Sequence, residues 1–475
     1  MNNLITSTGS YKYSHHECYP PGTKKLYQYV TPRGGEFPYT LFFGLQMFLP
    51  KISQLFTHHD IDEAEDDVNL HFGRKVFNRA GWEHILNKHG AHLPLRIDAV
   101  PEGLLLPIKD KNGRHIPVVT VQNTDDACFW LPGHIETSLL RAIWYATTVC
   151  TNSFACKVAI LQARNQSCDE PLAGLDYALH DFGARGVSSA ESAEIGGAAH
   201  LVNFKGSDTF ECLRPIRRIY GERMAANSVV AAEHSTIISW RRGRHTHEVD
   251  AYDNMLAKFA KEPGIITIVS DSYDLWFAIR HIWGGQMRQR VIDSGCTIVI
   301  RPDSGDPLTV PIKAIEMLAE FFGFSVNRKG YKVLPPCIRV IQGDGITRHT
   351  ISLILSNLLA AGFSAENLIF GMGGALLQTV NRDTMEWAMK VSATEDQTGW
   401  WDVWKSPGDQ PMKQSLAGRF GLINETGEFA DYETVPLGDD RNLLATVWEN
   451  GVTLVNEQFS DIRQRAQEAA LAVKP

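Results

Sequence analysis

Polar residues that could do chemistry cluster at the ends of four short apolar segments in the second half of the chain. Carboxylates can bind ribose hydroxyls or a magnesium ion, an arginine can bind phosphate through paired hydrogen bonds, and a glycine turn presents backbone N–H groups to an anion. These residue types could together bind a sugar, a phosphate and a metal ion. The clusters are Asp271 after 265–270, Arg301 and Asp303 after 296–300, Gly343 and Asp344 after 337–342, and the run GMGG (371–374) after 367–370.

A histidine after a fifth apolar segment, 228–232, is a further candidate for chemistry. An isolated histidine is usually a hydrogen-bonded structural residue, but His234 stands beside Glu233 where a strand is expected to end. This position makes it a candidate nucleophile or acid–base group. Other histidine pairs have no apolar strand before them, and we interpret them as solvated turns rather than metal ligands: His15 and His16, His58 and His59, His245 and His247.

Each of the four clusters also has a simpler structural interpretation. An aspartate after a strand commonly caps the next helix, the segment RPDSGDP (301–307) could form a turn, and glycines follow strands in many loops. Four clusters in succession, each directly after an apolar segment, nevertheless favour a functional site.

The elements that must position these residues alternate between strand and helix from about residue 175 to about residue 375. Short β-branched segments end in Gly, Asp or Ser clusters and give way to helix-like stretches, which is typical of a parallel sheet or barrel. One covering helix is predicted over 347–361, with Gly362 as its stop. We favour an α/β fold with a (β/α) barrel over an open sheet, because no strong crossover signal marks a switch point. In a barrel the strand ends surround one mouth, so the clusters would form one site.

The two flanks of this region have a different pattern. The first 150 residues contain extended segments and a predicted hairpin with its turn at Asn112 and Gly113. The last 80 or so residues predict short strands followed by a helix from about Ser460. Neither flank shows a catalytic pattern of its own.

Composition excludes several classes of protein. With 46 basic and 54 acidic residues, the formal charge of -8 argues against a nucleic-acid surface. No apolar run is long enough to span a bilayer, and the start of the chain does not resemble a signal peptide. The eight cysteines form no C-x-x-C pair, which indicates reduced thiols rather than a zinc cage or a redox pair. We therefore expect a soluble cytoplasmic protein.

Nine segments, in order along nearly the whole chain, make this sequence resemble the nicotinamide phosphoribosyltransferases, a type II phosphoribosyltransferase family. The resemblance implies an irregular (β/α) barrel and a second α+β domain built from both chain ends, with division at 1–150, 151–385 and 386–475. It also implies a homodimer with its sites at the subunit interface. The segments are SYK (from Ser10), YPPGT (Tyr19), HDFGARGVSS (His180), NFKGSDT (Asn203), AAEHSTI (Ala231), SDSYD (Ser270), RPDSGDP (Arg301), VIQGDGI (Val340) and FGMGGALLQ (Phe370).

The resemblance further implies transfer of a phosphoribosyl group from phosphoribosyl pyrophosphate to nicotinamide, which yields nicotinamide mononucleotide and pyrophosphate in NAD salvage. Phe182 and Tyr11 of the partner subunit would sandwich the pyridine ring, since flat aromatic faces suit an aromatic substrate. Asp208 would accept a hydrogen bond from the carboxamide, and this carboxylate would repel nicotinate. No strong base is needed, because the pyridine nitrogen is already a nucleophile.

The resemblance assigns the remaining roles to sugar, phosphate, metal and ATP. His234 would be phosphorylated by ATP as a co-substrate, with Glu233 in support, and Asp271 and Asp303 would be the carboxylates on the side of Mg²⁺. Carboxylates near the sugar and cations at pyrophosphate would stabilise the charges that develop at each end of the breaking bond. The other contacts would be Arg185 and Arg301 near the base, ribose or pyrophosphate; Gly343, Asp344 and Asp303 at the ribose; and Gly373, Gly374 and Arg382 at the 5'-phosphate.

Three positions depart from the family pattern, and two other functions stay open. Gly9 replaces an acidic residue before SYK, Met372 replaces a serine before the glycine pair, and a lysine-rich loop is reduced to Lys413 with GRF from Gly418. These changes bear on affinity for ATP and phosphate. The alternatives are a nicotinate phosphoribosyltransferase, which shares the architecture, and a catalytically silent ligand-binding relative.

Overall fold

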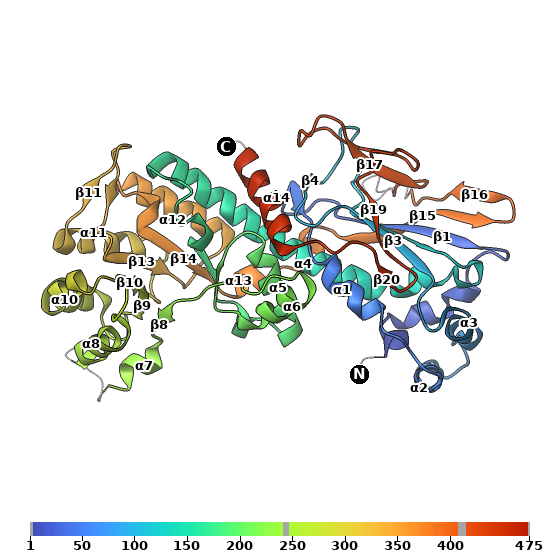
Figure 1. Cartoon of the computed structure of the whole chain (residues 1–475), viewed down its shortest axis with the longest axis horizontal. Coiled ribbons are helices and arrows are strands. Elements are labelled where there is room, and N and C mark those ends of the chain that lie inside the picture. Colours follow the sequence, from blue (N-terminus) through green and yellow to red (C-terminus); the bar gives the residue numbers. More distant parts are fainter. Residues whose placement is uncertain (1–2, 241–246, 407–414, 474–475) are drawn as a thin grey trace. The chain divides into compact units, whose positions relative to one another are not determined.

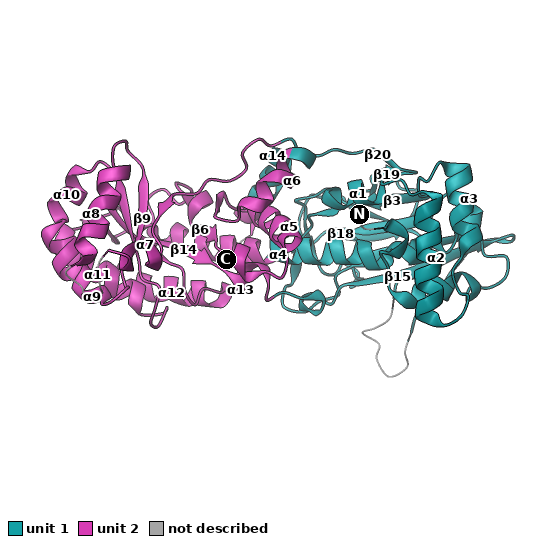
Figure 2. Ribbon diagram, turned by 90° about the horizontal axis from the view of Figure 1, so that it is seen from below, with its two compact units in different colours: residues 1–151, 218–221, 380–469 teal, residues 152–217, 222–379, 470–475 magenta. Residues whose placement is uncertain are grey.

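The computed structural model describes residues 3–240, 247–406 and 415–473, and the chain forms two compact units (Figure 2). Unit 1 contains most of the two flanks of the sequence and one short internal piece: Met1–Thr151, Arg218–Gly221 and Val380–Ala469. Unit 2 contains most of the middle: Asn152–Arg217, Glu222–Thr379 and Ala470–Pro475. Helix α4 (Leu131–Ser167) contributes residues to both.

Seven parallel strands form the sheet of unit 2, in the order β7-β6-β14-β13-β10-β9-β8 (Figure 1). An isolated parallel bridge between Gly206 and Asn227 joins edge strand β7 to the segment just before the opposite edge strand, so the sheet closes into a barrel. The strands are β6 (Leu179–Asp181), β7 (Gly206–Ser207), β8 (Val230–Ala231), β9 (Ile265–Val269), β10 (Thr297–Arg301), β13 (Ile338–Gln342) and β14 (Leu368–Met372).

Helices alternate with these strands and cover them, because apolar strands buried on both faces need a layer on each side. The central strands β9, β10, β13 and β14 are largely buried. Helix α12 (Arg348–Ala360) matches the predicted helix closely, with Thr347 accepting from the backbone N–H of Thr350 as its N-cap. The other helices are α5 (Ala190–Leu201), α6 (Leu213–Ile219), α7 (His234–Ile238), α8 (Glu248–Phe259), α9 (Leu275–Phe277), α10 (Arg288–Asp293), α11 (Val310–Phe322) and α13 (Gly374–Leu377), together with the π-helix Ala278–Gln286 and the hairpin β11 (Ser325–Val326) and β12 (Lys332–Val333).

Unit 1 is built on an antiparallel sheet in the order β16-β15-β1-β5-β3-β19-β20. Strands from the two chain ends pair directly, since β1 lies between β5 and β15. The elements are β1 (Lys25–Thr31), β3 (Leu95–Ala99), β5 (Val119–Asn123), β15 (Ala388–Asp396), β16 (Gly399–Asp402), β19 (Ala445–Glu449), β20 (Val452–Thr453), the pairs β2 (Tyr39–Leu41) with β4 (Leu105–Pro107) and β17 (Phe420–Asn424) with β18 (Tyr432–Pro436), and helices α1 (Leu45–Ile52), α2 (His58–Phe72), α3 (Arg79–His89) and α14 (Phe459–Ala472).

A buried hydrogen-bond network explains why the short piece 218–221 belongs to unit 1. Tyr220 is fully buried, its ring stacks on Phe43, and its hydroxyl donates to Oε2 of Glu102 at 2.7 Å. The other carboxylate oxygen of Glu102 accepts the backbone N–H groups of Gly44 and Gln46. Burial raises the pKa of Glu102 to about 7.

The predicted hairpin at Asn112 and Gly113 is only partly correct. The turn forms, with Lys109 bridged to His115 and Gly113 at a positive φ of 77°. The strands on its two sides then separate, because β4 pairs with β2 whereas β5 pairs with β1 and β3. The helix predicted from about Ser460 is confirmed as α14.

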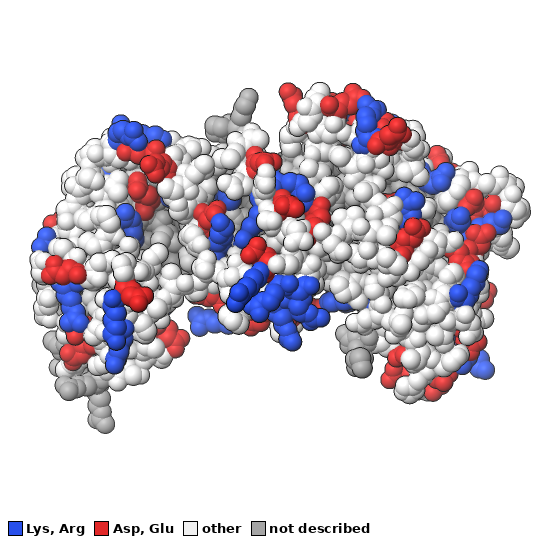
Figure 3. Space-filling model, viewed as in Figure 1, with Lys and Arg blue, Asp and Glu red and all other residues white. Residues whose placement is uncertain are grey.

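The surface carries charges of both signs. Acidic and basic side chains are interspersed over most of the face drawn in Figure 3, with one group of basic side chains over α6, where Arg214, Arg217 and Arg218 are exposed. Among the residues that the structure describes, no helix is long and apolar enough to cross a membrane.

Candidate active site

The barrel places most of the predicted site residues at the carboxyl ends of its strands. Phe182 follows β6, Asp208 follows β7, His234 follows β8 and Asp271 follows β9. Because all seven strands run in one direction, these ends lie around a single mouth. The same mouth receives, from β10, β13 and β14, the residues Arg301, Asp303, Gly343, Asp344, Gly373 and Gly374.

His234 is held by an aspartate from the neighbouring strand. Its Nε2 lies 3.0 Å from Oδ1 of Asp271, whose side chain is only 5% exposed. The second oxygen of Asp271 accepts the backbone N–H of Asp303 at 3.0 Å and the hydroxyl of Ser304 at 2.6 Å. Both oxygens of Asp271 are therefore hydrogen-bonded and fix the orientation of the imidazole, while Nδ1 of His234 lies 3.8 Å from Oδ2 of Asp303.

This arrangement changes the role expected for Glu233. The sequence suggested that Glu233 supports the imidazole, but its carboxylate accepts a short hydrogen bond from Ser235 and the residue is exposed. Glu233 is also the N-cap of α7, which fixes its backbone rather than the ring of His234. The residue that contacts the imidazole is Asp271, which the resemblance gave as a substrate-binding and metal-side carboxylate.

Asp303 and Arg301 lie close together without forming a hydrogen bond. Nε of Arg301 and Oδ1 of Asp303 are 3.8 Å apart, and Oδ2 of Asp303 is 3.8 Å from Nδ1 of His234. Nε of Arg301 is buried and has no hydrogen-bond partner among the described residues. Burying an arginine N–H group without an acceptor costs free energy. This group is therefore available to donate to an oxygen-rich anionic ligand in the mouth.

Two glycines create the space for the ring of Phe182. A Cβ atom on Gly371 would lie 2.0 Å from Cε2 of Phe182, and one on Gly343 would lie 3.2 Å from the same atom. Both distances are shorter than ordinary contacts, so these strand ends must be bare for the ring to lie against them. Gly343 and Gly371 therefore have a packing role in addition to any ligand contact.

Asp208 is positioned by its neighbours. Its carboxylate accepts a short hydrogen bond from Ser228, and its backbone N–H donates to the carbonyl of Asp181. Asp181 is itself fully buried, with Oδ1 accepting the N–H of Gly183 at 2.7 Å. Burial, with a smaller contribution from the charge of Asp208, raises the pKa of Asp181 to about 6. The carboxyl group of Asp181 is therefore harder to ionise than that of an ordinary aspartate.

A cavity of about 440 Å³ contains three of these groups. Phe182, Asp208 and Arg301 line it together with inward-facing apolar side chains of β9, β10, β13 and β14. The volume is that of a small-molecule site, and the mixture of an aromatic face, a carboxylate and a guanidinium suits a planar polar ligand.

The glycine turn after β14 packs closely on the turn after β6. Gly373 is the N-cap of α13, and a Cβ on Gly186 would lie 3.3 Å from Gly374. Arg185 lies in the same turn, η5 (Ala184–Gly186), and is exposed. The close packing of the two turns therefore brings the segment that contains Arg185 near the backbone N–H groups at the start of α13.

Known proteins match this chain from end to end. Residues 177–451 match the family model of the nicotinate phosphoribosyltransferase (NAPRTase) family, and residues 3–97 match the N-terminal domain of nicotinamide phosphoribosyltransferase. The chain is 46% identical over 478 residues to a nicotinamide phosphoribosyltransferase of Xanthomonas campestris pv. campestris (strain 8004), with 99% of each chain covered. The chain belongs to the nicotinamide phosphoribosyltransferase family. The nicotinamide phosphoribosyltransferase of Mycoplasma pneumoniae (strain ATCC 29342 / M129 / Subtype 1) is 32% identical over 88% of this chain and 96% of its own.

Solved structures support the fold of this family member. A crystal structure of human nicotinic acid phosphoribosyltransferase aligns with a TM-score of 0.58 at 14% identity and covers 98% of this chain and 94% of its own. The predicted fold class, a type II phosphoribosyltransferase barrel with a second α+β domain, is confirmed. The predicted enzyme class, a glycosyltransferase that transfers a pentosyl group, is confirmed by the family.

Some site residues expected for a nicotinamide phosphoribosyltransferase lie in unit 1. Tyr11 is in the 3₁₀ helix η2 (Ser10–Glu17) and is 60% exposed. Arg382 begins η10 (Arg382–Thr384) and pairs with Asp383 at 2.8 Å. Their roles in the family site stay predictions. Lys413, like His245, lies outside the described residues.

A larger hollow of about 900 Å³ also lies in unit 1. Gly418 and Arg419 of the GRF segment line it with Trp400 and Trp404. It contains none of the carboxylates and histidines assigned to the family reaction, so we place the chemistry at the barrel mouth.

Two contributors to the base side of the site were missed in the sequence. Ser228 precedes β8 rather than following it, so a search for polar residues after strands passes over it. Asp181 is the last residue of β6, and its only signal was its place beside Phe182 in HDFG. Both act on Asp208, one through a hydrogen bond and one through charge.

We predict that Gly371→Ala displaces the ring of Phe182, because the new methyl group would overlap it. Overpacking of this kind costs about 1 to 3 kcal/mol, so the melting temperature should fall and KM for nicotinamide should rise. Gly264→Ala is the matched control, since its Cβ would meet only the carbonyl of Glu262 at 4.0 Å and the residue lies outside the site. Wild-type stability and KM in Gly371→Ala would show that the ring does not lie against β14.

Proposed function

We propose that the barrel mouth transfers the phosphoribosyl group of phosphoribosyl pyrophosphate to nicotinamide, giving nicotinamide mononucleotide and pyrophosphate in NAD salvage. The observation that carries this proposal is the cavity that Phe182, Asp208 and Arg301 line together. Family membership supports the reaction type. The eight free cysteines and the absence of a spanning helix among the described residues support a cytoplasmic location.

Asp208 selects the base by charge and hydrogen bonding. A carboxylate accepts from the carboxamide NH₂ of nicotinamide but repels the carboxylate of nicotinate. Ser228 holds one oxygen of Asp208, which leaves the other oxygen for the substrate. The repulsion of an anionic base by Asp208 favours nicotinamide over the nicotinate alternative.

The transfer step needs charge stabilisation more than proton transfer. The pyridine nitrogen attacks C1' of the ribose, the bond from C1' to the pyrophosphate oxygen breaks, and the electron pair leaves with pyrophosphate. Positive charge on the ribose is stabilised by the carboxylates of Asp303 and Asp344, and negative charge on pyrophosphate by Arg301. The buried Nε–H of Arg301, which has no hydrogen-bond partner among the described residues, would then donate to a pyrophosphate oxygen.

Asp208→Asn should shift base preference toward nicotinate. Loss of a charged hydrogen-bond acceptor in the site costs about 1 to 3 kcal/mol, or about ten- to a hundredfold in kcat/KM for nicotinamide. The measurement is the ratio of kcat/KM for nicotinamide to that for nicotinate.

Ser228→Ala is the control, because it keeps the carboxylate and removes only its hydroxyl partner. Ser228→Ala should raise KM for nicotinamide modestly and should not allow nicotinate to be used as a substrate. A ratio that is the same in Asp208→Asn and wild type would remove Asp208 from base recognition.

His234 is the proposed phosphate carrier from ATP. Asp271 holds the ring through Nε2, so Nδ1 keeps its lone pair for attack on the γ-phosphorus. The phosphorus–nitrogen bond forms as the bond to the β-phosphate oxygen breaks and ADP leaves, and water later releases phosphate from the histidine. The 43% exposure of the side chain leaves room for this ligand.

The mouth also suits Mg²⁺. This ion keeps several waters and usually needs only one or two protein carboxylates beside substrate phosphates. Asp303 is the free carboxylate, since it is 30% exposed and no closer than 3.8 Å to its charged neighbours. Asp271 would take part only by giving up a hydrogen bond. When bound, Mg²⁺ would neutralise charge on the pyrophosphate.

His234→Ala should abolish ATP hydrolysis and the acid-labile phosphate on the protein. Slow product formation without ATP should persist, because the base and ribose contacts remain. Labelling with γ-labelled ATP, followed by acid or base treatment, distinguishes histidine phosphate from serine phosphate.

His281→Ala, an exposed histidine of the same unit, should label like wild type. Label that persists in His234→Ala, or ATP stimulation that is undiminished there, would assign the coupling to another residue.

The complete site is proposed to form in a homodimer, with Tyr11 of the partner subunit facing Phe182. The exposure of Tyr11 in unit 1 supports this role, because a large exposed aromatic ring is well suited to a subunit contact. Nicotinamide would then lie between two aromatic faces.

Inactive Tyr11→Ala and Asp303→Ala proteins should partly restore each other's activity when co-expressed. A mixed dimer would contain one site that has both residues. Activity of the purified mixed dimer is the measurement, with each parent homodimer as reference. If mixed dimers form and stay as inactive as the parents, Tyr11 does not act across the interface.

A further inference from the structure

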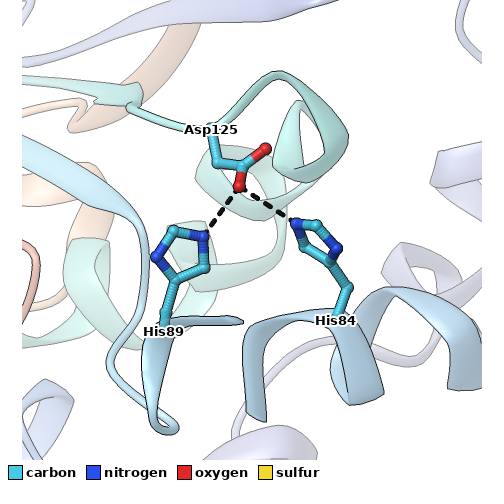
Figure 4. A group of neighbouring side chains, drawn as sticks. All are labelled: His84, His89 and Asp125. Atoms are coloured by element: carbon cyan, nitrogen blue, oxygen red, sulfur yellow. Dashed lines mark hydrogen bonds and ion pairs between the residues drawn. The ribbon is translucent and has the colours of Figure 1, made fainter. Parts of the chain in front are cut away.

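Two histidines and an aspartate converge in unit 1, in the other unit from His234 and Asp271 (Figure 4). Nε2 of His84 lies 3.0 Å from Oδ2 of Asp125, and Nε2 of His89 lies 2.7 Å from the same oxygen. The histidines come from the second half of α3, and Asp125 follows β5. Segments far apart in the sequence thus direct three potential ligand atoms at one point.

Asp125 is fixed before any ligand arrives. Its Oδ1 accepts the backbone N–H of Ala127 at 2.9 Å, as N-cap of η3 (Asp126–Cys128), and its carbonyl accepts from Asn123. Its side chain is 9% exposed. Its Oδ2 receives Lys88, His84 and His89 together, so hydrogen bonds hold both carboxylate oxygens in place.

The donor set has the chemistry of a transition-metal site. Two imidazole nitrogens and one carboxylate oxygen are ligands that Zn²⁺ binds at about 2.0 to 2.2 Å, with water in an open fourth position. The three ligand atoms lie within 4.8 Å of one another. Tetrahedral ligands at such distances are about 3.3 Å apart. The two contacts to Asp125 must therefore open by about half an ångström, and ligand atoms that are up to 4.8 Å apart must move closer together.

The histidines are accessible but not free on the surface. Their side chains are 32% and 24% exposed for His84 and His89, which admits an ion and a water from one side. In the metal-free state each Nε2–H donates to Asp125. Coordination requires the lone pair at Nε2, so each ring would carry its proton on Nδ1 instead.

Lys88 competes for the same carboxylate oxygen. Its Nζ lies 2.8 Å from Oδ2 of Asp125, and its side chain is 59% exposed. An ammonium group cannot coordinate a cation and would repel one, but a side chain this exposed can turn into solvent. Lys88 therefore opposes metal binding without blocking it.

We propose that His84, His89 and Asp125 form a binding site for a borderline divalent transition-metal ion such as Zn²⁺. The bound ion joins α3 to the segment after β5 and stabilises unit 1 by RT ln(1 + L/Kd), where L is the free ion concentration. The site requires none of the residues assigned to phosphoribosyl transfer.

The test measures Zn²⁺ binding by the full-length protein without a polyhistidine tag, after removal of metals with a chelator. Competition with a chromophoric chelator gives the affinity and the number of ions, and Co²⁺ absorption reports the coordination. Wild type should bind one ion more than His84→Ala and His89→Ala. Removing a group that only orients a ligand costs about 10- to 100-fold, so losing a ligand should cost at least about 100-fold.

Three further variants keep the result interpretable. Asp125→Asn retains the oxygen that caps Ala127, so it should fold normally, as circular dichroism would verify, and bind Zn²⁺ weakly. His58→Ala, an exposed histidine of α2, should bind like wild type. Lys88→Met should bind several-fold more tightly than wild type, and Zn²⁺ should raise its melting temperature more.

Ions held at the barrel mouth would be retained in all these variants, so only the difference between variants counts. Equal Zn²⁺ binding by wild type, His84→Ala and His89→Ala would overturn the proposal. So would the absence of any bound ion in both wild type and Lys88→Met, which would leave the cluster as a hydrogen-bonded support of α3.

Discussion

Parallel hydrogen bonding among the seven strands of unit 2 is the constraint on which the candidate site depends. Since β6, β7, β8, β9, β10, β13 and β14 all run in one direction, their carboxyl ends must meet at one mouth, although the residues there span positions 182 to 374 of the chain. The bridge from Gly206 to Asn227 completes the circle and brings Asp208 near Ser228. The common direction of the strands therefore brings the carboxylates, the histidine and the arginine of the site together.

Steric fit within this mouth is as strict as the topology. The ring of Phe182 lies against β13 and β14 only because positions 343 and 371 have no side chain. The hydrogen bonds of Asp271 join three neighbouring strand ends, since it contacts His234, Asp303 and Ser304. Packing and hydrogen bonds consequently fix Phe182 and His234 in the mouth. Asp303 and Arg301 lie 3.8 Å apart without a hydrogen bond between them, and charged substrate groups are expected there.

Local patterns in the sequence predicted the barrel and the strand ends at which the candidate site residues lie. The segments before Asp271, Arg301 and Gly343 are apolar and β-branched, and each forms a buried strand at the expected place. Side-chain partnerships were harder to predict, because direction is set by packing rather than by spacing. Glu233 is adjacent to His234 in sequence but turns to Ser235, while Asp271, 37 residues later, contacts the ring. The cluster of His84, His89 and Asp125 was invisible for the same reason.

The sheet of unit 1 has a consequence for the order in which the chain is made. Strand β1 pairs with β15, from Lys25 opposite Glu395 to Thr31 opposite Ala388. One edge of β1 therefore stays unpaired until residues 388–395 have been synthesised. All strands of the barrel leave the ribosome before β15 does. Contacts this distant in sequence form slowly, and an unpaired strand edge is prone to aggregation meanwhile. The barrel can therefore close early, whereas the nascent amino-terminal strands need protection, by a chaperone or by their own partial pairing with β5, until the last strands emerge.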